Sequence, residues 1–137
     1  MTGVDIDRIH HKRIKKILSP SEHHIQSAYF SWVRLRYPGC KLIYAVPNSS
    51  KLTDAGRVYK WQEGLTAGIP DVNIDISCGG YHGARIEFKR HDGRVTDEQL
   101  EAQRQLKDAG YWVIECRSTE EAIDATTSYL RSWQWGQ

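Results

Sequence analysis

The stretch Gly68-Ile69-Pro70-Asp71-Val72-Asn73-Ile74-Asp75-Ile76, followed by Ala84-Arg85-Ile86-Glu87-Phe88-Lys89, decides the fold of this chain. Apolar residues occupy every second position in both segments, which is the period of a β-strand with one apolar face. The residues between them include Ser77-Cys78-Gly79-Gly80, a run of turn formers. The two segments therefore predict a β-hairpin whose register is set by its buried face.

Helix and strand signals on both sides of this hairpin complete an α/β pattern. Ser19-Pro20-Ser21-Glu22 predicts a capping box, with Ser19 as the N-cap of a helix that ends near Tyr37. Further along the chain we expect a strand over 41–46, a short helix over 57–63, a helix from the Thr96 capping box to 109, a strand over 111–116 and a final helix over 119–130. A hairpin followed by a crossover helix predicts a small mixed sheet flanked by helices.

Length and composition fit one globular domain. The chain has 137 residues, of which 39% are hydrophobic and 26% charged, enough for one core and too few for two ordinary domains. We assign this domain to 19–137. Residues 1–18 form an appendage with five cations and no acid between Arg8 and Leu18. This segment is either a basic arm or helix that contacts phosphates, or a solvated terminus.

Neither a membrane nor an oxidising compartment is expected. No apolar run approaches the roughly 18 residues that span a bilayer, and the N-terminus lacks the apolar core of a signal peptide. The three cysteines, Cys40, Cys78 and Cys116, form no CxxC pair. Reduced thiols in a cytoplasm are the interpretation that this pattern favours.

Charge is divided unevenly along the chain. Residues 1–60 hold 11 Lys and Arg but 4 Asp and Glu, whereas residues 61–137 hold 8 and 13. A basic half favours a polyanionic partner, while the acidic half requires its own explanation. A dipolar surface without functional meaning is the alternative.

Two carboxylates and an ammonium converge at one edge of the expected hairpin. Asp71 begins the first strand directly after Pro70, and Glu87 and Lys89 share one face of the second. Asp71 and Glu87, with the backbone carbonyl of Phe88, suit a hard divalent cation such as Mg²⁺. Lys89 can then orient a water and offset charge on a phosphorane. The alternative is a charged, solvent-facing side of an ordinary hairpin, and Asp75 is the substitute ligand if Asp71 is not one.

These residues resemble the PD-(D/E)xK nuclease superfamily, and more narrowly its VRR-NUC family. The features that carry the resemblance, in chain order, are Glu22, Pro47-Asn48, Gly64-x-x-x-Gly68-Ile69-Pro70-Asp71, Glu87-x-Lys89 and Thr96-x-x-Gln99 with Leu106 and Gly110. The resemblance implies a restriction-endonuclease-like αβββαβ core, which is the order expected above. Arg90 stands where family members often carry a glycine.

The resemblance also implies roles for individual residues. Glu22 and Gln99 join the catalytic set with Asp71, Glu87 and Lys89, although both are also expected in capping boxes. Residues expected to contact nucleic acid are Asn48, Lys51, Arg57, Lys60 and Arg90. Singly, each of these is also compatible with turn chemistry or a solvated side chain.

The function that the resemblance implies is a Mg²⁺- or Mn²⁺-dependent DNA endonuclease. Stand-alone members of the family resemble Holliday-junction resolvases, which implies branched or four-way-junction DNA as substrate and a homodimer as the working unit. A two-fold dimer places two cleavage centres symmetrically with a single gene. The alternatives are a flap or nicking nuclease without junction preference, a DNA-binding module that does not turn over, and a structural protein.

Overall fold

One mixed four-stranded sheet organises the chain. The structure, a computed structural model, describes residues 19–47 and 52–136, so the expected arm over 1–18 lies outside the described residues. The strands β1 (Ile43–Ala45), β2 (Val72–Ile74), β3 (Ala84–Phe88) and β4 (Trp112–Cys116) lie side by side in chain order. β1, β2 and β3 are antiparallel neighbours, while β4 pairs parallel to β3. The predicted hairpin and mixed sheet are confirmed.

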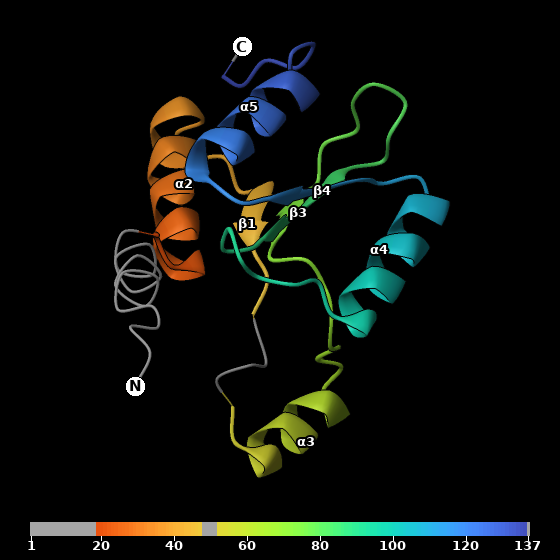
Figure 1. Ribbon diagram of the computed structural model, residues 1–137. Coiled ribbons are helices and arrows are strands. Elements are labelled where there is room, and N and C mark those ends of the chain that lie inside the picture. The colour runs from red at the N-terminus through yellow and green to blue at the C-terminus, as the bar shows by residue number, and fades with distance from the viewer. Residues whose placement is uncertain (1–18, 48–51, 137) are drawn as a thin grey trace, which may run out of the picture.

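Helices flank this sheet on both faces. They are α2 (Glu22–Arg36), α3 (Asp54–Gln62), α4 (Asp97–Asp108) and α5 (Thr119–Tyr129). α2 packs against α5 and β3, whereas α4 packs beside β4 at the right of the view in Figure 1. The predicted αβββαβ core is therefore confirmed, with α3 inserted between β1 and β2.

The main hydrophobic core lies between the sheet and the pair α2 and α5. Tyr29 of α2 and Phe88 of β3 are fully buried, with their ring centroids 5.6 Å apart. The Tyr29 hydroxyl and the Thr126 hydroxyl of α5 are hydrogen-bonded at 2.7 Å. This polar contact satisfies both buried groups, so α2 and α5 are joined by packing and by a hydrogen bond.

The second face of the hairpin is closed to solvent at one end, where Glu87 and Lys89 lie. Glu87 and Lys89 are only 3% and 7% exposed, because α4 and the loop that follows β3 cover this face. The alternative interpretation, that these two residues lie on the solvent-facing side of an ordinary hairpin, is therefore wrong. Their burial needs a physical explanation, since ionised side chains rarely lose their water without a partner.

Two helix starts differ from the sequence prediction. α2 begins two residues later than expected, with Ser21 as N-cap and its hydroxyl accepting the His24 N–H, so Glu22 is not part of a capping box. α3 begins at Asp54 after the Thr53 N-cap, three residues earlier than predicted. The capping box of Thr96 and Gln99 is confirmed.

Among the described residues, no helix has the length and apolar character that crossing a bilayer demands. Cys40, Cys78 and Cys116 are all free thiols.

Gly68 allows the segment before β2 to approach α4 closely. Its φ is +82°, and a Cβ there would lie 2.4 Å from the Glu98 carbonyl oxygen at the start of α4. Gly64 has a similar φ of +101°, yet a Cβ there would meet nothing within 4 Å. Any other residue would therefore have a strained backbone at both positions. Only at Gly68 would its side chain also clash with α4.

We expect Gly68→Ala to destabilise the protein by several kcal/mol more than Gly64→Ala. Both substitutions place alanine at positive φ, which costs about 1–2 kcal/mol, and only the first also forces the segment away from α4. Chemical denaturation of the two variants measures the difference. Equal free energies of unfolding would contradict the close approach.

Candidate active site

Asp71 and Glu87 are held side by side at the ends of two neighbouring strands. Asp71 directly precedes β2, and its Oδ2 accepts a 2.7 Å hydrogen bond from the Phe88 N–H of β3. Glu87 lies on β3, and its Oε1 accepts a 2.8 Å hydrogen bond from Gln99 Nε2 of α4. The strand register and these two donors bring together the two carboxylates that the sequence predicts as metal ligands.

Gln99 serves the helix and the site at once. Its Oε1 accepts the Thr96 N–H at 2.9 Å, which completes the capping box of α4. Its Nε2 is thereby directed at Glu87. The two interpretations of Gln99 that the sequence left open are therefore compatible, because one amide group has both an acceptor and a donor.

Burial and like charge act together on the two carboxylates. Burial raises the pKa of Glu87 from its ordinary 4.5 to about 8, and the negative charge of Asp71 adds to this rise. Burial also raises the pKa of Asp71, although the Phe88 N–H lowers it in part. Two carboxylates that resist ionisation in one place are a frequent mark of a functional site.

Lys89 is the nearest compensating charge. Its ammonium lowers the pKa of both Asp71 and Glu87, and its side chain is buried against the loop after β3. A Cβ on Gly93 of that loop would lie 3.5 Å from Lys89 Cδ. One buried cation beside two carboxylates leaves the cluster with a net negative charge when all three are ionised.

The remaining oxygens fit a hard divalent cation. Glu87 Oε2 is buried and has no hydrogen-bond partner within the described residues, which is costly unless a ligand occupies the place. A small cavity of about 50 Å³ lies here, lined by Asp71, Glu87 and Gln99 among others. Carboxylate oxygens are the ligands that Mg²⁺ and Mn²⁺ prefer. In the described part of the chain, no group of three or more His, Cys, Asp or Glu is placed to hold an ion, so an ion at this place would have two carboxylates as its side-chain ligands.

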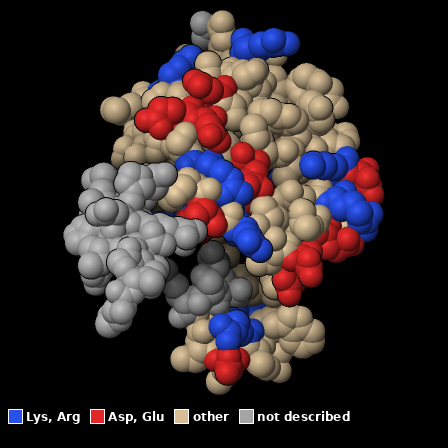
Figure 2. Space-filling view, viewed as in Figure 1, with Lys and Arg blue, Asp and Glu red and all other residues tan. Residues whose placement is uncertain are grey.

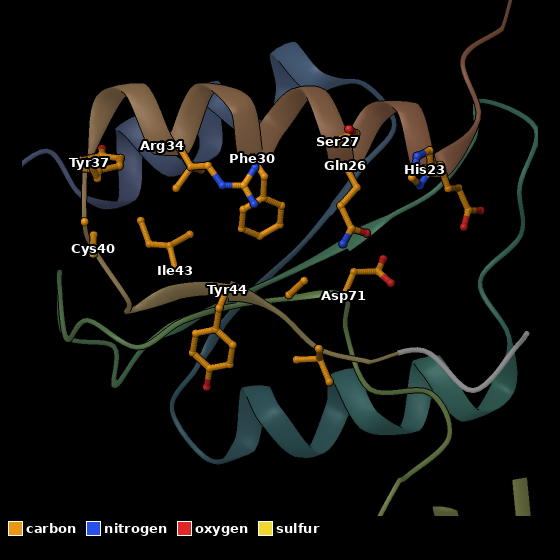
Figure 3. Close-up of a pocket in the computed structure, with 15 residues that line it drawn as sticks. His23, Gln26, Ser27, Phe30, Arg34, Tyr37, Cys40, Ile43, Tyr44 and Asp71 are labelled. Atoms are coloured by element: carbon orange, nitrogen blue, oxygen red, sulfur yellow. The ribbon is translucent and has the colours of Figure 1, made fainter. Parts of the chain in front are cut away.

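Glu22 lies at the edge of this cluster. It is exposed at the first turn of α2, and its charge raises the pKa of both Asp71 and Glu87. Glu22 and Asp71 line one end of a groove of about 710 Å³ between α2 and β1. Figure 3 shows the Asp71 side chain pointing toward α2, on the side of Gln26. Glu22 therefore influences both carboxylates through its charge, and no hydrogen bond joins it to either of them in the described part of the chain.

Two of the residues expected to contact nucleic acid, Arg57 and Lys60, lie away from the cluster. Asn48 and Lys51 lie outside the described residues. Arg57 and Lys60 lie on α3 in exposed ion pairs with Asp54 and Glu63, and neither lines the cavity of Asp71 and Glu87. In the described part of the face in Figure 2, Lys and Arg are interspersed with Asp and Glu.

Arg90 directly follows Lys89 and begins the loop that covers it. Its Nε lies 3.8 Å from Asp92 Oδ1, and its side chain is partly exposed. Among Arg57, Lys60 and Arg90, the three expected basic contacts that the structure describes, Arg90 is thus the one adjacent to the cluster.

Arg117 is a positioning residue that the sequence did not indicate. Its Nη1 donates to the carbonyl oxygens of Arg90 at 2.7 Å, His91 at 3.3 Å and Gly93 at 2.7 Å. Its other amino group pairs with Glu115. Arg117 therefore fixes the loop that packs on Lys89, and no local motif marks an arginine after a strand for such a role.

Asp75 does not take the place of Asp71. Its Oδ2 accepts a 2.6 Å hydrogen bond from the Tyr44 hydroxyl, and its Oδ1 pairs with Arg85 at 3.2 Å. Both oxygens thus have partners away from Glu87.

Comparisons with known proteins bear on the fold. A solved structure described as a "VRR_NUC domain protein" is similar to this chain, with a TM-score of 0.70 and 24% sequence identity over 85% of this chain and 93% of that chain. No protein-family model matches the sequence, and no curated protein matches it. The likeness shows that the α/β arrangement is that of a VRR-NUC domain, which confirms the fold that the resemblance implied.

We expect Glu87→Gln to stabilise the metal-free protein at neutral pH. The substitution keeps an oxygen for Gln99 and removes the cost of either protonating or burying the Glu87 carboxylate beside Asp71, a gain of about 1 kcal/mol or more. Because the folded state raises the Glu87 pKa from 4.5 to about 8, stability of the unaltered protein should fall as pH rises between these values. The variant should lose this slope, as measured by thermal unfolding from pH 4 to pH 8.

Divalent cations should stabilise the unaltered protein, whereas ionisation of Glu87 in their absence destabilises it. Mg²⁺ or Mn²⁺ bound to the folded state raises the melting temperature by mass action, and Glu87→Gln should abolish that rise. Asp75→Asn is the matched control, since it should keep the metal-induced rise. Retention of the rise in Glu87→Gln would remove Glu87 from the ligand set.

Proposed function

We propose that this protein is a divalent-metal-dependent DNA endonuclease. The observation that carries the proposal is the pair of half-buried Asp71 and buried Glu87, with one Glu87 oxygen lacking a partner and Lys89 beside both. A VRR-NUC fold adds support, since the superfamily that the motif resembles hydrolyses phosphodiesters. Hydrolysis of a phosphodiester needs these parts and no organic cofactor.

Asp71, Glu87 and the Phe88 carbonyl are the groups that would hold Mg²⁺ or Mn²⁺. When bound, such an ion lowers the pKa of a water and offsets the charge of the scissile phosphate. The carboxylates are pre-positioned for this by the Phe88 N–H and by Gln99. Little reorganisation is then required during the reaction, which is the main source of electrostatic catalysis.

Lys89 has two tasks in this proposal. Its ammonium donates a hydrogen bond that orients the attacking water, and its charge stabilises the negative charge that develops on the phosphorane. The loop held by Arg117 limits the positions that the Lys89 side chain can take. Glu22, across the cluster, contacts water on the other side of Asp71 and positions it.

The groove between α2 and β1 is the path proposed for the cleaved strand. It ends at Glu22 and Asp71, and Arg34, Phe30 and Tyr44 lie along it (Figure 3). Aromatic and guanidinium groups stack on nucleobases. Arg90 at the other side of the cluster, with Asn48, Lys51, Arg57 and Lys60, would contact phosphates of the same DNA.

We assign branched DNA, in particular the four-way junction, as the preferred substrate, and a homodimer as the active form. Both follow from the resemblance, and the dimer also from the need for two symmetric cleavages. A flap or nicking nuclease without junction preference, or a DNA-binding module that does not turn over, are the outcomes that the experiment below distinguishes.

We expect Asp71→Asn and Lys89→Met each to lower cleavage by about 100-fold or more while DNA binding persists. The measurement is cleavage of linear, nicked, flap and four-way-junction DNA with Mg²⁺, with Mn²⁺ and with chelator. Binding is followed in parallel by fluorescence anisotropy at several salt concentrations, where affinity should fall steeply as salt rises.

The Asp75→Asn variant serves as the control, because it removes an exposed carboxylate outside the cluster, and it should cut at the normal rate. Normal cutting by both Asp71→Asn and Lys89→Met would refute the site. Salt-dependent binding without metal-dependent cutting of any substrate would favour a binding module instead.

A further inference from the structure

β1 has one backbone edge that no strand covers. It is the first strand in the order of the sheet, so only β2 pairs with it. The Val46 N–H donates to the Asp71 carbonyl oxygen at 2.8 Å, so the backbone groups of Val46 face β2. Because successive residues of a strand direct these groups to opposite sides, the N–H and C=O groups of Ile43 and Ala45 point away from β2. Within the described residues, no hydrogen bond reaches these outward-facing groups.

The groove between α2 and β1 runs along this free edge. It has a volume of about 710 Å³, and Ile43 and Ala45 line it from the side of β1. From α2, the side chains of Gln26 and Phe30 project toward β1, as Figure 3 shows. The guanidinium carbon of Arg34 lies 5.9 Å from the centroid of the half-buried Phe30 ring. The groove therefore combines an aromatic ring, a side-chain amide and backbone groups without partners.

Positive charge gathers at the end of the groove that is remote from the candidate active site. Arg34 lines this end, and Arg36 and Lys41 are exposed on either side of the turn over 37–40 that closes it. Within the described residues, none of these three cations has an ion pair. Glu22 lines the opposite end, 12 residues before Arg34 on α2, which is about 18 Å along the helix. A strand in the groove would thus run from unpaired cations to the proposed metal ligands.

A second groove, between the segment 66–69 and α4, does not suit a nucleic acid. It has a volume of about 690 Å³, and its lining is largely apolar. The charged residues that line it are Asp97, Glu98 and Glu101, and no Lys or Arg of the described chain does so. This acidic wall repels phosphates. Charge therefore favours the groove between α2 and β1 as the place where DNA lies.

We propose that the groove between α2 and β1 receives an unpaired nucleobase, and that the cleaved phosphate lies next to that nucleotide. The face of the base stacks on Phe30, and its edge exchanges hydrogen bonds with Gln26 and with the free backbone groups of Ile43 and Ala45. This inference rests on the proposed function. It defines the substrate class as DNA with unpaired nucleotides at the position of cleavage, as at a branch point.

A base that remains paired cannot make these contacts. Within a duplex, neighbouring bases cover both faces of each base and the opposite strand occupies its pairing edge, so a base must leave the stack before it enters a pocket. A volume of about 710 Å³ is typical of pockets that enclose one small ligand, and it does not admit a duplex. The free-energy cost of leaving the stack is lowest where pairing is already interrupted. The groove would therefore select branched over continuous DNA without reading its sequence.

The first experiment measures binding of the full chain to labelled DNA by fluorescence anisotropy, with chelator present so that no strand is cut. The probes are a blunt duplex, a single strand, and the same duplex carrying a single-stranded branch. We expect the two DNAs with unpaired nucleotides to bind about tenfold or more tightly than the blunt duplex. Equal affinity for all three probes would overturn the base-binding groove.

Two groove variants locate the preference. Phe30→Leu keeps an apolar side chain against the core and removes the ring, so it should lower the preference for unpaired DNA by about tenfold. Arg34→Gln should weaken binding of the single strand and lower the slope of log affinity against log salt by about 0.7, the share of one phosphate contact. An unchanged preference and slope in both variants would overturn the groove and leave the free edge of β1 to an added peptide strand.

Two control variants remove exposed side chains outside the groove. Leu35 is 84% exposed on α2 and Trp61 is 70% exposed on α3, and neither lines the groove. Leu35→Ala and Trp61→Ala should therefore keep the preference for unpaired DNA. A loss in Trp61→Ala as large as that in Phe30→Leu would place base stacking on α3 and overturn the inference.

Cleavage in Mg²⁺ tests the position of the cut. Duplexes with one unpaired nucleotide at successive positions should be cut next to that nucleotide, so the cut should move with it. Phe30→Leu should cut these duplexes about tenfold more slowly. A cut that stays at one sequence when the unpaired nucleotide moves would overturn the inference.

Thermal unfolding and the two assays together separate this inference from the proposed function. Phe30→Leu and Arg34→Gln should remain folded, and Mg²⁺ or Mn²⁺ should still raise their melting temperatures, because the metal ligands are unaltered. Metal-dependent cutting without any preference for unpaired nucleotides would overturn the groove and uphold the nuclease. Preferential, Phe30-dependent binding of unpaired DNA without cutting would uphold the groove as a base-binding site and overturn the nuclease.

Discussion

The central constraint in this structure is that the buried carboxylate of Glu87 lies next to the half-buried carboxylate of Asp71. Burying one ionised carboxylate costs several kcal/mol, and a second at short range adds repulsion. Asp71 and Glu87 are nevertheless held by the register of β2 and β3, which the apolar residues on the opposite face pin in place. Core packing on one side of the sheet thus stabilises an electrostatically unfavourable arrangement on the other. A cation bound by both carboxylates would offset this cost of burial and repulsion.

The surroundings of the pair are built from distant segments that each restrict one group. α4 contributes Gln99, whose amide is oriented by the helix cap itself. β4 is followed by Arg117, which holds the loop over Lys89 through three carbonyl oxygens. Gly68 lets the segment before Asp71 lie directly against α4. The cap of α4, the loop held by Arg117 and the close approach at Gly68 therefore restrict the same group of side chains, those of Asp71, Glu87 and Lys89.

The two faces of the sheet have different tasks. The face under α2 and α5 is a conventional core of aromatic and aliphatic side chains, joined by the buried bond of Tyr29 and Thr126. The face under α4 is polar and close to the surface, and the groove beside it is apolar and unfilled. Stability and function are separated in this way, so that polar residues at the site do not interrupt the core.

The sequence by itself determined the hairpin, the element order and the pairing of Asp71, Glu87 and Lys89. These features follow from local rules, since a period of two sets which side chains share a face and a capping box sets where α4 begins. Even locally the sequence was ambiguous where two residues suit one role: Ser19 and Ser21 are both good N-caps, and the helix uses Ser21.

Only the tertiary structure decided that Glu87 and Lys89 on the charged face of the hairpin are buried, that Gln99 reaches Glu87, and that Arg117 holds the loop over Lys89. It also decided that Trp61 lies on an exposed helix and not in the core. Each of these depends on how segments far apart in the chain pack together. Local propensity carries no information about such contacts, because the same residues form the same helix or strand whether or not a neighbour covers them.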